Sequence, residues 1–198
     1  HFIFNCLNSI ENFIMKNDKK AASEYLNKFS ELIRIMLDSN RTELASFAKN
    51  MEGIKLYVEL EQLRFDNKFS FRVEIDPQLL NGDFRVPHLL TQPYIENAIL
   101  HGLSQSEREN LELFLSAELN DDYINYVIED NGIGREKSAE YKLQNKPDHK
   151  SIGLQLTQER INIFNQQQNG EGGVEITDLY DKNNEAGGTR VHIKIKAS

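Results

Sequence analysis

The stretch QPYIENAILHG, residues 92–102, decides how the rest of this sequence is interpreted. Its apolar residues recur at helical spacing, which predicts an amphipathic helix. Glu96 and Asn97 are adjacent, so their side chains point about 100° apart around the helix axis, whereas Asn97 and His101 are four residues apart and share a face. The helix therefore offers a carboxylate, an amide and an imidazole to its surroundings.

Two later stretches contain residues that could line a binding pocket together with this helix. EDNGIG, residues 129–134, predicts a strand that ends in an acid and a glycine turn, and SIGL, residues 151–154, predicts a glycine at a helix start. Asp130 can accept a hydrogen bond from an exocyclic amine, and Gly132 and Gly134 let the backbone approach a flat ring. Free N–H groups at Gly153 suit a phosphate. Together the three stretches predict a site for an adenine nucleotide.

Plainer interpretations of the same residues stay open at this point. Asn-Gly is common in ordinary turns between a strand and a helix. His101 precedes Gly102, so it also suits a helix C-terminus, where it would interact with the dipole. An amide oxygen such as that of Asn97 is a hard ligand that suits Mg²⁺, which normally takes few protein ligands beside water and phosphate oxygens.

Composition and charge narrow the class of protein. The 198 residues are 39% hydrophobic and 27% charged, which is typical of a soluble globular chain. The net charge of -8, most of it after residue 66, argues against a nucleic-acid partner. The single cysteine, Cys6, excludes an internal disulfide and fits a buried, inert thiol. Because the sequence opens on His1 and not on methionine, we expect an excerpt of a longer protein.

Apolar periodicity divides the sequence near residue 66. Before residue 66 the apolar residues form broad helical stripes with a spacing close to a heptad repeat. This pattern predicts an antiparallel helical hairpin that dimerises. The alternative is that both apolar faces of the hairpin pack within the same chain. The part after residue 66 mixes strands and helices. The predicted helices are 1–17, 19–38, 44–65, 86–101 with a kink at Pro93, a short one within 135–150, and 153–168; the predicted strands are 68–75, 110–119, 123–130, 174–180 and 189–196.

In this order the three stretches resemble the ATP-binding fold that bacterial histidine kinases share with gyrase and MutL, and GGTRVHIKI at 187–195 resembles its closing strand. HFIFNCLNSI at the start and LRF at 63–65 are similar to the LytS-type sensor histidine kinases. The resemblance implies an α+β chain with two domains. Residues 1–66 would be dimerisation and phosphotransfer helices, and residues 67–198 a two-layer α/β sandwich with a mixed sheet that binds ATP.

The resemblance also implies roles for particular residues. His1 would be the phosphoacceptor, Asn97 the Mg²⁺ ligand and Asp130 the group that selects adenine, while the remaining nucleotide contacts would come from His101, Gly132, Gly134, Ser151, Gly153, Leu154 and Thr189. Asn5, one turn after His1, and Glu96 are candidates to position the imidazole. The implied partners are a second copy of the chain and the receiver domain of a response regulator. We expect the cytoplasmic domain of an inner-membrane protein, anchored through its missing N-terminal part.

The sequence departs from the family pattern at three positions, and two of these departures, at residues 100 and 151, favour a second class of function. Leu100 stands where a lysine is usual, Ser151 where a glycine is common, and Leu156 where an asparagine is usual. The alternative is therefore a degenerate dimeric module that binds nucleotide, or none, without kinase activity. An ATP-hydrolysing clamp ranks lower, because its glutamate base would fall at Pro93.

Overall fold

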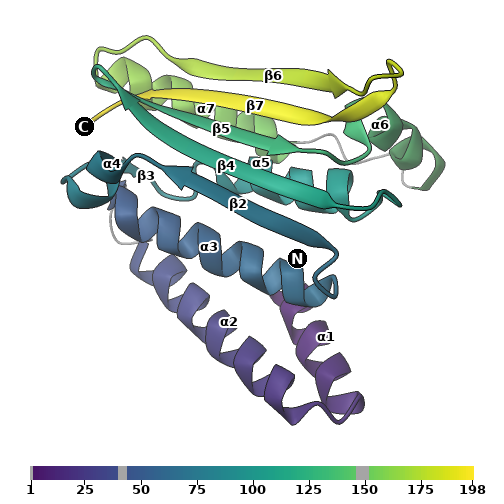
Figure 1. Ribbon diagram of the computed structural model, residues 1–198. Helices are drawn as coiled ribbons and strands as arrows, with labels where there is room; N and C mark the ends of the chain where they lie inside the picture. Colours follow the sequence, from purple (N-terminus) through teal and green to yellow (C-terminus); the bar gives the residue numbers. More distant parts are fainter. Residues whose placement is uncertain (1, 40–43, 146–151) are drawn as a thin grey trace.

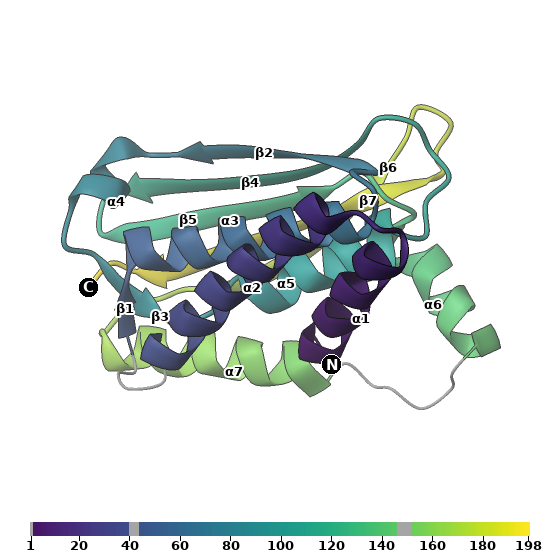
Figure 2. The ribbon, with the colours of Figure 1, turned by 90° about the horizontal axis from the view of Figure 1, so that it is seen from below.

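A five-stranded mixed sheet forms one layer of the molecule, and helices cover one of its faces (Figure 2). This is a computed structural model, and it describes residues 2–39, 44–145 and 152–198. The strand order is β2 (Phe69–Ile75), β4 (Leu111–Asn120), β5 (Tyr123–Asp130), β7 (Ala186–Lys196) and β6 (Gly173–Tyr180). β2 and β4 are parallel and the other neighbours are antiparallel, so the predicted α+β class and mixed sheet are confirmed.

Alternation along the strands directs one set of side chains toward the helices. On β4, Leu111, Leu113 and Leu115 are buried, and on β5 the buried set ends at Asp130. The register pairs Leu113 with Asp130, so the acid is the last member of an otherwise apolar row. A side chain in that row faces the helical layer and not the open face of the sheet.

Three helices lie under this face: α3 (Phe47–Arg64), α5 (Gln92–Asn97) and α7 (Ile152–Gln167) (Figure 2). α6 (Gly134–Asn145) follows the glycine turn and contacts β7. Ser46 is the N-cap of α3, and its hydroxyl accepts from the N–H of Lys49. The ring of Phe47 stacks on Tyr126 of β5, with 5.9 Å between the ring centroids. α3 is therefore fixed to the sheet at its first turn.

The predicted antiparallel hairpin is formed by α1 (Phe2–Met15) and α2 (Lys19–Ser39), which pack against α3 (Figure 1). Phe13 of α1 packs on Tyr25 of α2 at 5.7 Å, and Phe2 packs on Tyr57 of α3 at 5.2 Å. α3 thus contacts both the hairpin and the sheet. The division at residue 66 stays a prediction.

The single helix predicted over 86–101 is wrong in its first third. Val86 and Pro87 belong to a short strand, β3 (Arg85–Pro87), which pairs with β1 (Leu44–Ser46). The carbonyl of Pro87 accepts from the buried amide of Asn50, and Leu89 has φ +55°, which no α-helix tolerates. The helix starts at Gln92, where Pro93 lacks the N–H that a first turn leaves unpaired in any case. A short helix, α4 (Pro77–Asn81), was also not predicted.

α5 passes directly into a π-helical turn, η1 (Ala98–Leu103). The N–H of Ser104 donates to the carbonyl of Ile99, five residues back, at 2.9 Å. Such turns are rare and often lie at functional sites. Here the widened turn carries His101 and Gly102 to the end of β5.

Candidate functional site: a nucleotide pocket around Asp130

Asp130 is a buried carboxylate at the end of β5. Only 3% of its surface is exposed, and its Oδ1 accepts a hydrogen bond from the N–H of Gly132 at 2.9 Å. Burial raises the pKa of Asp130 to about 7; the charge of Glu129 adds to this shift and the bond from Gly132 opposes it. A ligand that donates a hydrogen bond to this group would restore the stabilisation that the buried charge lacks.

Gly102 and Gly132 pack backbone against backbone beside that carboxylate. A Cβ added to Gly102 would lie 2.6 Å from Asp130 Oδ1, and one added to Gly132 would lie 2.3 Å from the carbonyl carbon of Gly102. The N–H of Ile133 donates to the Gly102 carbonyl at 3.3 Å. From the sequence, Gly132 was predicted to be a site residue, whereas Gly102 was interpreted only as the end of a helix. Gly102 is the last residue of the QPYIENAILHG stretch.

The start of β7 completes this side of the pocket. Gly188 has φ +138°, and a Cβ there would lie 1.9 Å from the carbonyl oxygen of Asp130. Thr189 is the register partner of Asp130 and is half-buried. Gly134, with φ +77°, turns the chain into α6 opposite Ala186. The structure therefore places Asp130, Gly132, Gly134 and Thr189 close together, and their role as nucleotide contacts stays a prediction.

Asn97 ends α5 on the same helical segment. Its Nδ2 donates to the carbonyl of Pro93 at 2.6 Å, which fixes the amide and leaves Oδ1 as the acceptor for a cation. Within the described ranges no group of three or more His, Cys, Asp or Glu side chains is placed to hold a metal ion. The residues thus fit Mg²⁺ held by one amide together with phosphate oxygens and water, which is the usual manner for this ion.

Glu96 lies on α5 and interacts electrostatically with Arg64 of α3. It is half-buried, and burial raises the pKa of its carboxyl while the charge of Arg64 opposes the shift. Burial raises the pKa of Tyr57, the residue on which Phe2 packs, and the charges of Glu61 and Glu96 add to this shift. Glu96, a predicted positioning residue, therefore interacts electrostatically with the helix on which α1 packs. Asn5 is half-buried on α1 and its carbonyl accepts from Ser9.

The third wall is the start of α7, which contacts α5. Gly153 is exposed, with no atom within 4 Å of the position of a Cβ, and its carbonyl accepts from the hydroxyl of Thr157 at 2.8 Å. Leu154 packs against the core. His1 and Ser151, predicted as phosphoacceptor and nucleotide contact, lie outside the described residues.

Two side chains that support the turn were not identified from the sequence. Asn131 bridges strand ends, since its Oδ1 accepts from the N–H of Glu112 at 2.7 Å and its Nδ2 donates to the carbonyl of Asn110 at 3.0 Å. Arg108 donates to the carbonyls of Gly132 and Ala186. Asn131 lies within the EDNGIG stretch, but its hydrogen-bond partners are at residues 110 and 112, and the sequence does not show that these lie beside it. Arg108 carries no local signal.

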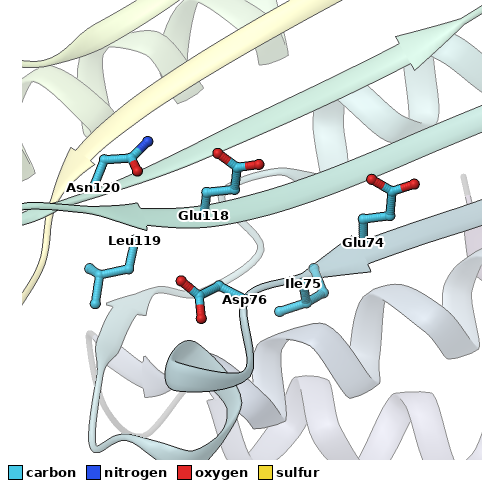
Figure 3. Close-up of a pocket in the computed structure, with 6 residues that line it drawn as sticks. All are labelled: Glu74, Ile75, Asp76, Glu118, Leu119 and Asn120. Carbon is cyan, nitrogen blue, oxygen red and sulfur yellow. The ribbon is translucent and has the colours of Figure 1, made fainter.

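A separate pocket lies at the opposite end of β4. Figure 3 shows its lining, which consists of Glu74, Ile75, Asp76, Glu118, Leu119 and Asn120. Three carboxylates and no basic side chain line it, so it repels a polyphosphate.

None of the helices in the described ranges is long and apolar enough to cross a membrane.

Known sequences resemble large parts of this chain. A family model described as histidine kinase matches residues 1–69. The chain is 30% identical over 166 residues to the YwpD protein of Bacillus subtilis, which covers 83% of the chain and 58% of that protein. It is 31% identical over 151 residues to the sensor protein LytS of Oceanobacillus iheyensis, which covers 76% of the chain and 25% of LytS. The chain therefore spans about a quarter to three fifths of these relatives' length.

Solved structures share the fold at low sequence identity. The histidine kinase AdeS of Acinetobacter baumannii is similar with a TM-score of 0.52 and 15% identity, over 99% of this chain and 95% of that one. The histidine kinase ThkA, solved in complex with the response regulator protein TrrA, is similar with a TM-score of 0.50 and 16% identity, over 99% of this chain and 59% of that one. Sequence and fold together identify the chain as a member of the LytS family of sensor histidine kinases, corresponding to their catalytic region.

Proposed function

We propose that this chain binds Mg²⁺–ATP, transfers the γ-phosphoryl group to His1, and passes it on to an aspartate of a response regulator. The observation that carries the proposal is the arrangement of Gly102, Asp130 and Gly132. A buried carboxylate has one oxygen held by a backbone N–H, and two glycines let the backbone pack directly beside it.

This arrangement suits adenine better than guanine. Gly132 occupies Oδ1 of Asp130, and no group in the described part of the chain donates to Oδ2. Adenine presents an exocyclic N–H donor at the position where guanine presents a carbonyl. The same carboxylate would therefore stabilise an adenine nucleotide and repel a guanine nucleotide.

Residues on α5 and α7 would hold the phosphates. Asn97 would supply an amide oxygen to Mg²⁺, and the free N–H groups at Gly153 and Leu154 would donate to phosphate oxygens. His101, half-buried on η1, is a candidate for a further donor. Bound Mg²⁺ would neutralise charge that develops on the transferred group. Leu100 contributes no charge here, so we expect weaker ATP binding than in relatives with a lysine at this position.

The chain would contribute orientation to the transfer itself. A neutral ring nitrogen of His1 forms the new N–P bond as the bond to the bridging oxygen of ADP breaks. An imidazole needs little activation near neutral pH, because its ordinary pKa of about 6.5 leaves it mostly unprotonated. Glu96 would accept a hydrogen bond from the other ring N–H and so orient the ring, with Asn5 as a second positioning group.

The hairpin would form the dimer. Its outward residues include Ile3, Phe4 and Leu7, of which Phe4 is 71% exposed. Exposed apolar side chains of this kind on a helical hairpin suit burial against a second copy. A response-regulator receiver domain would then bind beside the phosphorylated helix. We further propose that the chain is the cytoplasmic part of an inner-membrane sensor.

Incubation with γ-labelled ATP tests the proposal. An acid-labile label on the wild-type chain that is absent in His1→Gln supports autophosphorylation, and loss of the label on addition of a receiver domain supports the second transfer. Nucleotide binding without label would favour the alternative, a scaffold module without kinase activity. Steady ATP hydrolysis that survives His1→Gln would contradict both.

A further inference from the structure

Arg108 joins two segments of the pocket wall that are distant in sequence. Its Nη1 donates to the carbonyl of Gly132 at 3.3 Å, 24 residues away, and its Nη2 donates to the carbonyl of Ala186 at 2.8 Å, 78 residues away. The first acceptor belongs to the glycine turn after β5, and the second to the start of β7. One guanidinium therefore fixes both against each other.

The peptide unit between Gly132 and Ile133 is held at both of its polar ends. Its carbonyl accepts from Arg108, and its N–H donates to the carbonyl of Gly102 at 3.3 Å. The preceding N–H, of Gly132, donates to Asp130 Oδ1. Rotation of this peptide would break bonds on both sides and would move the N–H that orients the carboxylate.

The guanidinium is itself held in place. Asp181 Oδ2 lies 3.8 Å from Arg108 Nη2, and Asp181 Oδ1 accepts from the N–H groups of Asn183 and Glu185 at 2.8 and 3.0 Å. These backbone bonds lower the pKa of Asp181, so it is an anion at neutral pH. The carboxylate is fixed by its own loop and attracts the guanidinium of Arg108.

We infer that Arg108 is a positioning residue for base recognition: by holding the Gly132–Ile133 peptide against Gly102, it sets which oxygen of Asp130 faces the nucleotide base. Arg108 does not touch the base. The inference rests on the proposed function, because it assigns a role within the proposed adenine site. Arg108 should therefore affect the relative affinity for adenine and guanine nucleotides and should not affect the phosphoryl-transfer step.

The test compares Arg108→Met and Arg108→Lys with wild type in the same chain. Titration with ADP and with GDP, both without Mg²⁺, should show that Arg108→Met raises the Kd for ADP about tenfold, as expected for loss of a charge-assisted hydrogen bond, and lowers the GDP-to-ADP ratio of Kd by a similar factor. Arg108→Lys should fall between the two. The label incorporated at saturating ATP should stay within about twofold of wild type.

Arg72→Met is the matched control, since Arg72 is also a partly exposed arginine in an ion pair, with Glu112 at 3.3 Å, and it donates a hydrogen bond to neither glycine in the described structure. Amide exchange in the nucleotide-free chain gives a second readout: Ile133 should exchange faster in Arg108→Met and at the wild-type rate in Arg72→Met.

Two results overturn the inference alone: a Kd for ADP within about twofold of wild type, or equal weakening of ADP and GDP, in a chain whose wild type binds ADP. A wild-type chain that binds neither nucleotide overturns the proposed function, and this inference with it.

Discussion

The helical hairpin and the five-stranded sheet differ in how completely they bury their own apolar side chains. Among the described residues of the sheet strands, Tyr180 is the only exposed large hydrophobic side chain. The hairpin exposes a group of them on both helices: Ile3, Phe4, Leu7, Ile14, Met15, Leu26 and Leu37. The sheet region completes its core within one chain, whereas the hairpin leaves an apolar surface that a partner would cover. In the proposed dimer the hairpin would form the contact between the copies, and the sheet region would not.

Gly132→Ala should break the sheet region and leave the hairpin intact. The new Cβ would lie 2.3 to 2.7 Å from backbone atoms of Gly102, which cannot move without displacing η1. We expect a loss of stability on the order of 3 kcal/mol and loss of ADP binding, measured by thermal unfolding and calorimetry. Gly173→Ala is the control, because its nearest contact is an ordinary 3.9 Å. Equal effects from the two substitutions would contradict the close packing described here.

Arg64→Met tests the buried ion pair at the end of α3, the helix that contacts both regions. Glu61 is 1% exposed, and Arg64 Nη1 donates to its two carboxylate oxygens at 3.0 and 2.9 Å. Without Arg64 the buried carboxylate loses its partner, which should cost about 3 kcal/mol of unfolding free energy in urea. Burial already raises the pKa of Glu61, so the native state holds a proton more tightly than the unfolded chain. Loss of Arg64 raises that pKa further, so the deficit should grow as pH rises through the wild-type pKa of Glu61, which lies above 4.5.

The control for that substitution is Arg34→Met. Arg34 and Glu31 have the same three-residue spacing as Arg64 and Glu61, but their side chains are 73% and 44% exposed. An exposed pair contributes less than about 1 kcal/mol. A similar loss from both substitutions would mean that the burial of Glu61 has no energetic weight.

Phe4→Glu should separate the copies without unfolding either. Phe4 is 71% exposed, so the substitution removes little packing within the chain but places a charge in the proposed dimer surface. We expect dimerisation at least about 30-fold weaker by analytical ultracentrifugation, with an unchanged monomer fold by circular dichroism. Ile163→Glu on α7, where Ile163 is 53% exposed, should leave the dimer unaffected. A wild-type chain that sediments as a monomer would remove the distinction between the two regions.

The smallest expected effect is the pH dependence of nucleotide binding. Burial raises the pKa of Asp130 to about 7, and an amine that donates to the carboxylate favours the ionised form, so affinity for ADP should rise through pH 7. Between pH 6 and 8 the change should approach about tenfold, because about a tenth of the group is ionised at the first pH and nine tenths at the second. Calorimetry should find this step absent in Asp130→Asn. In the nucleotide-free chain the sign is opposite: stability should fall as pH rises from about 4 to 7.

Local sequence signals were sufficient for much of this molecule. Alternating apolar residues predicted the five long strands, and helical stripes predicted α1 and α2, because each pattern is complete within its own element. The turn around Gly132 was also predicted from its own residues. In these segments packing agrees with local preference.

The failures share a dependence on distant partners. β3 is a strand because Val86 pairs with Ala45, about forty positions earlier, and no property of residues 85–91 indicates that pairing. Gly102 is needed because Asp130 lies beside it, and Arg108 acts through carbonyls 24 and 78 residues away. A sequence gives the chemical types of such residues but not the contacts that define their roles.

The π-helical turn of η1 makes the pocket sensitive to the length of the chain as well as to its composition. Six residues occupy this turn, and its last bond reaches back over five positions instead of four. Deleting one residue here would permit a regular α-helix, which is the commoner conformation, but would rotate Gly102 by about 100° about the axis and turn it away from the carboxylate. A shortened chain would keep every predicted motif residue and lose their convergence.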